Sequence, residues 1–159
     1  MKQAEIARWL KGITLGIGIM GAVWFFLLVP MVAGEMRRDY PAAAFLYWPG
    51  LLYSFVIAAG CYAVLYQFWT VCCEIGKDRS FSRENAAAFR RISGIAVVLA
   101  IVWFAGIVGL AAVRCIQFGI LIFMVFAVFI SFAVAICAAA LSHLVYKAYE
   151  LKQESELTI

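Results

Sequence analysis

Five cysteines and one histidine are the side chains of this sequence best suited to metal or redox chemistry. A zinc site needs about four nitrogen or sulfur ligands, usually arranged in close pairs such as C-x-x-C. The sequence has no such pair, and its odd number of cysteines argues against a complete disulfide framework. We therefore interpret the thiols as small hydrophobic residues and expect no metal or other cofactor. The cysteines are Cys61, Cys72, Cys73, Cys115 and Cys137.

Signatures of catalysis and transport are also missing from the sequence pattern. There is no P-loop, no H-E-x-x-H and no recognisable pair of nucleophile and base. The long apolar runs contain no Asp, Glu, Lys, Arg or His, the residues that usually mark ion paths and substrate sites within membranes. Their main polar groups are Ser54, Gln67, Ser93 and Ser131. These features argue against an enzyme and against a coupled ion transporter.

Four apolar runs are long enough to cross a membrane. Hydrophobic residues make up 67% of the 159 residues and charged residues 14%, whereas a soluble domain averages about half and a quarter. A spanning helix needs roughly 20 apolar residues, and the runs lack the polar face that a soluble bundle would require. We predict an all-α membrane protein, a single domain whose four transmembrane helices form an antiparallel bundle. The expected spans are about 12–33, 45–71, 92–113 and 118–141.

Basic residues are distributed unequally between the two sides of this predicted bundle. The N-terminal segment, the loop 72–91 and the tail 142–159 share one side and carry ten of the 13 Lys and Arg residues. The positive-inside rule therefore predicts that both termini are cytoplasmic. Membrane topology thus explains the net charge of +4, and no direct nucleic-acid binding is expected, because the basic residues form no separate domain.

The loop and the tail also contain signals for where helices begin and end. We expect Gly76 to cap the C-terminus of the second spanning helix and Ser82 to cap the N-terminus of the third. The tail lacks Gly and Pro as far as Gln153, so the fourth helix should continue beyond the membrane. The third and fourth runs are separated only by residues 114–117, which predicts that these two helices are antiparallel neighbours.

Small residues recur every four positions on the fourth span, at Ala127, Ser131, Ala135 and Ala139. In lipid, small side chains allow another helix to approach closely. The seam could pack against a helix of the same bundle or against a second copy in a homo-oligomer. We favour packing within the bundle, because any four-helix bundle needs such seams.

The loop and the tail together resemble the signature of a bacterial membrane family. The loop reads IGKDRSFSREN at 75–85 and RRI at 90–92, and the tail reads LSHL at 141–144 and ELK at 150–152. With the order and length of the segments, these motifs resemble the family catalogued as domain of unknown function 2975. The resemblance implies four spans in the bacterial cytoplasmic membrane and no established biochemical activity. It also implies frequent encoding beside a small helix-turn-helix regulator.

The leading hypothesis is a non-enzymatic membrane regulator or sensor that acts with a small cytoplasmic helix-turn-helix regulator. One alternative is a bundle for small-molecule permeation or lipid binding, with a polar cavity around Gln67, Gln117 and Ser131. Another is a membrane scaffold or assembly subunit. The candidate partner-binding residues are Lys77, Asp78, Arg79, Phe81, Arg83, Glu84, Arg90, His143 and Glu150.

His143 follows the fourth span, and histidine can change its charge near neutral pH. It could sense pH or contact a ligand, or it could simply form a hydrogen bond near the end of the fourth span. We favour the structural role, because no second histidine or cysteine pair accompanies it.

Overall fold

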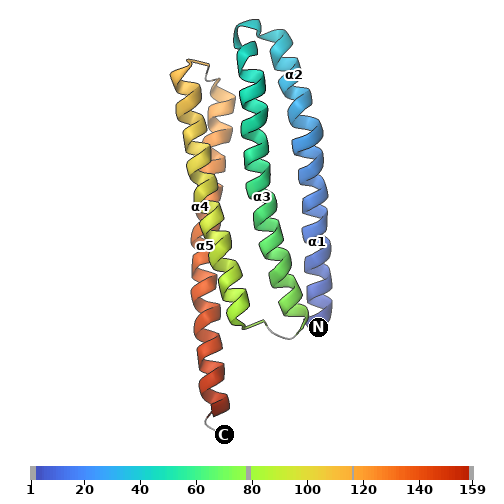
Figure 1. Cartoon of the computed structure of the whole chain (residues 1–159), viewed down its shortest axis with the longest axis vertical. Helices are drawn as coiled ribbons and strands as arrows, with labels where there is room; N and C mark the ends of the chain where they lie inside the picture. The colour runs from blue at the N-terminus through green and yellow to red at the C-terminus, as the bar shows by residue number, and fades with distance from the viewer. Residues whose placement is uncertain (1–2, 78–79, 116, 158–159) are drawn as a thin grey trace.

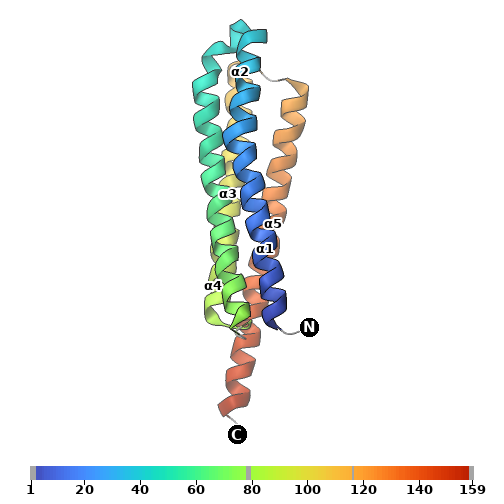
Figure 2. The same cartoon turned by 90° about the vertical axis from the view of Figure 1, so that its right-hand side faces the viewer.

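Long helices joined by short turns make up the computed structural model, which describes residues 3–77, 80–115 and 117–157 (Figures 1 and 2). A π-helical segment joins the first two helices without a break, and a 3-10 segment leads into the third. All described residues lie in helices or in the short segments that join them, which confirms the predicted all-α class. The elements are α1 (Gln3–Val23), η1 (Trp24–Leu28), α2 (Val29–Asp39), η2 (Pro41–Leu46), α3 (Tyr47–Gly76), α4 (Arg83–Ala112) and α5 (Phe118–Leu157).

Pro30 explains why the first helix changes its winding at η1. Proline has no N–H, and its ring clashes with the carbonyl group four residues earlier, so a regular α-helix cannot pass through it unchanged. The Val29 N–H instead bonds to the Trp24 carbonyl, five residues back, which is the wider π pattern. The helix then continues to Asp39 and ends at Tyr40. It therefore extends beyond the predicted span 12–33 at both ends.

Four helical stretches are long and apolar enough to cross a membrane. With 40 residues, α5 is about 60 Å long at 1.5 Å per residue, roughly twice the thickness of the hydrocarbon layer. Its C-terminal end extends past the other helices (Figure 1). The prediction that the fourth helix continues into the tail is confirmed. The four stretches are Glu5–Asp39, Pro41–Gly76, Arg83–Ala112 and Phe118–Ser155.

The bundle is open between its first and last helices. α1 and α2 pack on α3, α3 packs on α4, and α4 packs on α5. Within the described residues, no Cα atom of α1 lies within 8 Å of one in α5. The accessible surface is 10959 Å², whereas a soluble protein of 17.6 kDa exposes about 7,900 Å². Exposed apolar side chains such as Trp48 and Phe118 contribute to this surface, which lipid can cover.

Two tyrosines of α3 tie this helix to both of its neighbours. The Tyr53 hydroxyl donates to the Val102 carbonyl of α4 at 3.0 Å, and the Tyr62 hydroxyl donates to the Gly18 carbonyl of α1 at 2.8 Å. A hydroxyl group in hydrocarbon has no water to bind, so a partner within the protein is strongly favoured. These two bonds therefore fix the position of α3 between α1 and α4.

The turn between α4 and α5 reverses the chain within a few residues. Arg114 adopts the left-handed backbone conformation, with φ 54°, and the Cys115 N–H bonds to the Leu110 carbonyl at 3.2 Å. The two helices then pack side by side along their length (Figure 1). The prediction that they are antiparallel neighbours is confirmed.

The packed side of α5 follows a different spacing from the four-residue seam seen in the sequence. Ala135 is buried and Ala127 and Ser131 are half-buried, but Ala139 is exposed and Ala138 is buried in its place. A helix has 3.6 residues per turn, so a row of residues spaced by four drifts around its surface. A neighbouring helix is then contacted at alternating spacings of three and four.

Candidate functional site

Both termini and the loop between α3 and α4 lie at one end of the molecule (Figures 1 and 2). At this end α1 and α4 begin, α3 ends, and α5 continues beyond the packed helices. We call residues 76–91 and 142–157 the terminal face. It contains all the described candidates for partner binding, whereas Asp78 and Arg79 lie outside the described residues.

The end of α3 differs from the prediction by one residue. Gly76 is the last helical residue, and Lys77 is the C-terminal cap, with φ −95° and ψ 13°. Gly76 does not adopt a positive φ, which is the usual reason for glycine at a cap. It allows close packing instead, because a Cβ atom at Gly76 would lie 3.3 Å from the Cβ of Ala7. Lys77 Nζ forms an ion pair with Glu74 Oε1 at 2.9 Å.

The start of α4 is held by two buried polar residues of the loop motif. Ser82 caps the helix as predicted, because its Oγ accepts a hydrogen bond from the Asn85 N–H at 3.2 Å. Asn85 is 1% exposed, and its Nδ2 donates to the Ser80 carbonyl at 3.0 Å. These contacts fix the shape of the loop. They give Ser82 and Asn85 a structural role within the IGKDRSFSREN motif.

The other described candidates of the loop are exposed. Phe81 is 57% exposed, although it directly precedes the buried Ser82. Arg83, Glu84 and Arg90 are exposed on the first turns of α4. An exposed aromatic side chain two residues from an exposed arginine, on a loop of fixed shape, has the composition of a protein interface anchor. Lys77 is also exposed next to this loop.

The tail begins beside the first turn of α4. The Ser142 Oγ donates to the Ala86 carbonyl at 2.8 Å, which joins α5 to α4 at this point. His143 and Glu150 are exposed and lie about two helical turns apart on the same side of α5. Leu144 and Leu151 are exposed with the same spacing. The tail therefore presents a polar row and an apolar row that begin beside the first turn of α4 and continue past it.

No described contact joins His143 or Glu150 to the exposed candidates of the loop. Their common location at the terminal face comes from the arrangement of the helices, not from a shared ion pair or hydrogen bond. Among the described residues, no group of three His, Cys, Asp or Glu side chains is placed to hold a metal ion. The cysteines are all free thiols.

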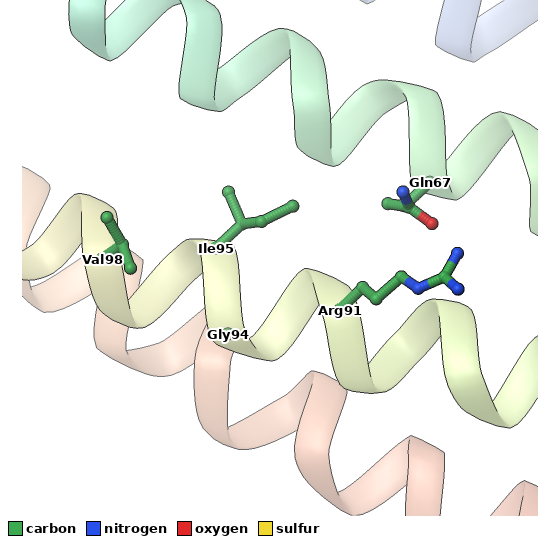
Figure 3. A pocket seen from close by; sticks show the side chains of 5 residues that line it. All are labelled: Gln67, Arg91, Gly94, Ile95 and Val98. Carbon is green, nitrogen blue, oxygen red and sulfur yellow. The ribbon is translucent and has the colours of Figure 1, made fainter.

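A shallow groove with largely apolar walls lies between α3 and α4. It has a volume of about 380 Å³ and is lined by Gln67 of α3 and by four residues of α4 (Figure 3). Ser131 and Gln117, which the sequence grouped with Gln67, do not line it. The sequence could have indicated the groove through Arg91, the last charged residue before the apolar run of α4. The α4 residues are Arg91, Gly94, Ile95 and Val98.

The four long apolar helices and the absence of strands among the described residues define a multi-pass α-helical membrane protein. Residues 31–159 match the family model described as a protein of unknown function, DUF2975, and the chain belongs to this family. The chain is 30% identical over 149 residues to the uncharacterized membrane protein YoaS of Bacillus subtilis (strain 168), an alignment that covers 92% of each protein. No solved structure matches the chain. The resemblance seen in the loop and tail motifs is thus confirmed.

Proposed function

We propose that this protein is a non-enzymatic membrane-bound regulator or sensor whose terminal face binds a small cytoplasmic helix-turn-helix regulator. The observation that carries the proposal is Phe81, an exposed aromatic side chain on a loop fixed by the buried Ser82 and Asn85. Location in the bacterial cytoplasmic membrane with both termini inside is part of the proposal. The excess of Lys and Arg on that side supports it.

The terminal face offers two kinds of binding chemistry. Phe81 can enter an apolar pocket. Arg83, and Arg90 about two turns further along α4, favour an acidic surface on the partner, which would also increase the association rate. The tail adds Leu144 and Leu151, spaced as the anchors of a helix that lies in a groove. A partner that contacts both parts would be held at the membrane and kept away from DNA. A signal that changed the terminal face would release it.

The test is affinity purification of the full chain from native membranes in mild detergent, followed by mass spectrometry. The test variant combines Phe81→Ala with Arg83→Glu and Arg90→Glu. The matched control is Arg8→Glu, because Arg8 is an exposed basic residue at the same end of the molecule but on α1. A helix-turn-helix protein should be recovered with the native chain and the control, and lost with the test variant. Equal thermal stability of the variants in detergent would show that folding is intact.

Other outcomes of this purification would contradict the proposal. Recovery of another membrane protein, with no regulator, would favour a scaffold or assembly subunit. Recovery of differently tagged copies of this chain alone would favour a homo-oligomer. Unchanged recovery of the regulator with the triple variant would exclude the loop as its binding surface, and the tail residues Glu150 and Leu151 would then be substituted.

The groove between α3 and α4 favours a second candidate function, the binding of a lipid within the bundle. The groove combines a guanidinium group with apolar walls, which suits a lipid better than a water-soluble solute. This candidate needs no protein partner and can coexist with the first.

A further inference from the structure

The groove between α3 and α4 lies where the apolar part of α4 begins. Arg91 directly precedes the uncharged run that starts at Ile92. Gln67 lies within the apolar run of α3, on the opposite wall of the groove. The polar heads of Arg91 and Gln67 point toward one another (Figure 3). The groove therefore has a polar end close to the boundary between headgroups and hydrocarbon.

The remaining walls of the groove are apolar and leave space beside α4. Ile95 and Val98 follow Arg91 along the helix, in the direction of the hydrocarbon core. A Cβ atom at Gly94 would meet nothing within 4 Å, so this wall is open to an added group. One end of the groove is thus cationic and the other apolar, and the two are aligned along the helix. A phospholipid could fit this arrangement, with its charged headgroup at the cationic end and an acyl chain along the apolar end.

The charge of Arg91 has no counterpart within the described protein. No carboxylate in the described ranges forms a salt bridge with its guanidinium group. Ionisable residues close to hydrocarbon are costly unless they are paired or reach the interface. A guanidinium group presents several N–H donors in a planar fork that fits two phosphate oxygens. The Gln67 carboxamide can add one further donor to the same phosphate group.

We propose that this groove binds an anionic phospholipid of the leaflet on the side of the termini. Its phosphate contacts Arg91 and Gln67, and an acyl chain lies along Gly94, Ile95 and Val98. Basic pockets between membrane helices commonly recognise anionic lipid headgroups in this way. The proposal rests on the second candidate function, lipid binding in this groove, and needs no protein partner. Only Arg91 of the groove belongs to the terminal face; Gln67, Gly94, Ile95 and Val98 lie outside it.

The test measures phosphatidylglycerol and phosphatidylcholine binding to the full purified chain by native mass spectrometry from mild detergent. The native chain should retain phosphatidylglycerol in preference to phosphatidylcholine. Arg91→Gln should weaken phosphatidylglycerol binding about tenfold, the effect of losing one charge-assisted contact. Arg90→Gln is the matched control, because it removes the same charge from the adjacent residue, which does not line the groove. It should change binding by less than about twofold, within the usual effect of a surface substitution.

A second variant tests the apolar part of the groove. Gly94→Leu fills the space beside α4 and keeps Arg91 and Gln67, so phosphatidylglycerol binding should fall while folding is retained. Thermal unfolding without added lipid should not occur at a lower temperature in any of the three variants. The replaced arginines have no described hydrogen bond, and a Cβ atom at Gly94 would meet no neighbour within 4 Å.

Three results would overturn the proposal. Equal losses for Arg91→Gln and Arg90→Gln would show only a diffuse attraction to basic residues. Unchanged binding with Gly94→Leu would place the lipid outside the groove. Competition by inorganic phosphate or glycerol phosphate at concentrations comparable to the lipid would identify a site for a free phosphate group rather than for a phospholipid.

Discussion

Tyr53 of α3 and Gly106 of α4 face each other across the interface between these helices. The Tyr53 hydroxyl reaches the Val102 carbonyl at 3.0 Å, and it occupies the space that a side chain at Gly106 would need. The rings of Trp103 and Tyr53 form a T-shaped pair, with the ring centroids 6.0 Å apart. The close approach of α3 and α4 therefore depends on the absence of a Cβ atom at one position.

Gly106→Ala is predicted to destabilise the protein. The new Cβ atom would lie 2.6 Å from Tyr53 Cζ and 2.7 Å from Met124 Cε, so both neighbours would have to move. Overpacking of this kind costs about 1–3 kcal/mol in the free energy of unfolding. Thermal unfolding in detergent should show a lower Tm. The control is Gly109→Ala on the same helix, where a Cβ atom meets nothing within 4 Å. Equal destabilisation by the two variants would contradict the close contact at Gly106.

Ser82→Ala is predicted to loosen the start of α4. The substitution removes the acceptor for the Asn85 N–H, and loss of such a cap typically costs about 0.5–2 kcal/mol. Ser82→Asp should retain most of the stability, because aspartate is a comparable cap. Hydrogen–deuterium exchange should increase for residues 83–88 in the alanine variant alone. Equal exchange in both variants would show that the cap does not control this turn.

Ser142→Ala is predicted to weaken the attachment of the tail to α4. The hydrogen bond from Ser142 Oγ to the Ala86 carbonyl would be lost, at a cost of about 0.5–1.5 kcal/mol. His143→Ala is the matched control, because His143 is adjacent but exposed. Limited proteolysis of the tail should become faster in the Ser142 variant and stay unchanged in the His143 variant. The opposite order would assign the anchoring role to the histidine.

Both termini are predicted to lie in the cytoplasm. The excess of Lys and Arg around the termini and the loop 72–91 should hold this orientation. A green fluorescent protein fused after Ile159 should fluoresce in a bacterial host, and alkaline phosphatase fused after Arg38 should be active. Activity of the phosphatase when it is fused within the loop 72–91 would reverse the assignment, and the proposed contact with a cytoplasmic regulator would fail with it.

The sequence alone determined the class of the protein and most of its helices. Twenty or more consecutive apolar residues can satisfy their backbone groups in hydrocarbon only as a helix or within a closed barrel, so the four spans follow from composition and length. Local rules also gave the cap at Ser82 and the continuation of α5 into the tail, because each depends on neighbours within one or two turns. The exposure of Phe81 could not be predicted, since an aromatic residue before a helix is buried or exposed according to distant contacts.

Only the tertiary structure decided which helices are neighbours and what lies between them. The order α1, α3, α4, α5 places α4 between α3 and α5, which groups Gln67 with Arg91 and separates it from Ser131. On α5, the structure buries Ala138, whereas Ala139, which belongs to the small-residue seam predicted from the sequence, is exposed. Lipid tails are as apolar as the side chains of the spans, so hydrophobicity drives the helices into the membrane but does not select which helices pair. The fit between facing surfaces, as at Gly106 and Gly76, selects the neighbouring helix. This fit depends on residues far apart in the sequence, so it can be seen only in the folded protein.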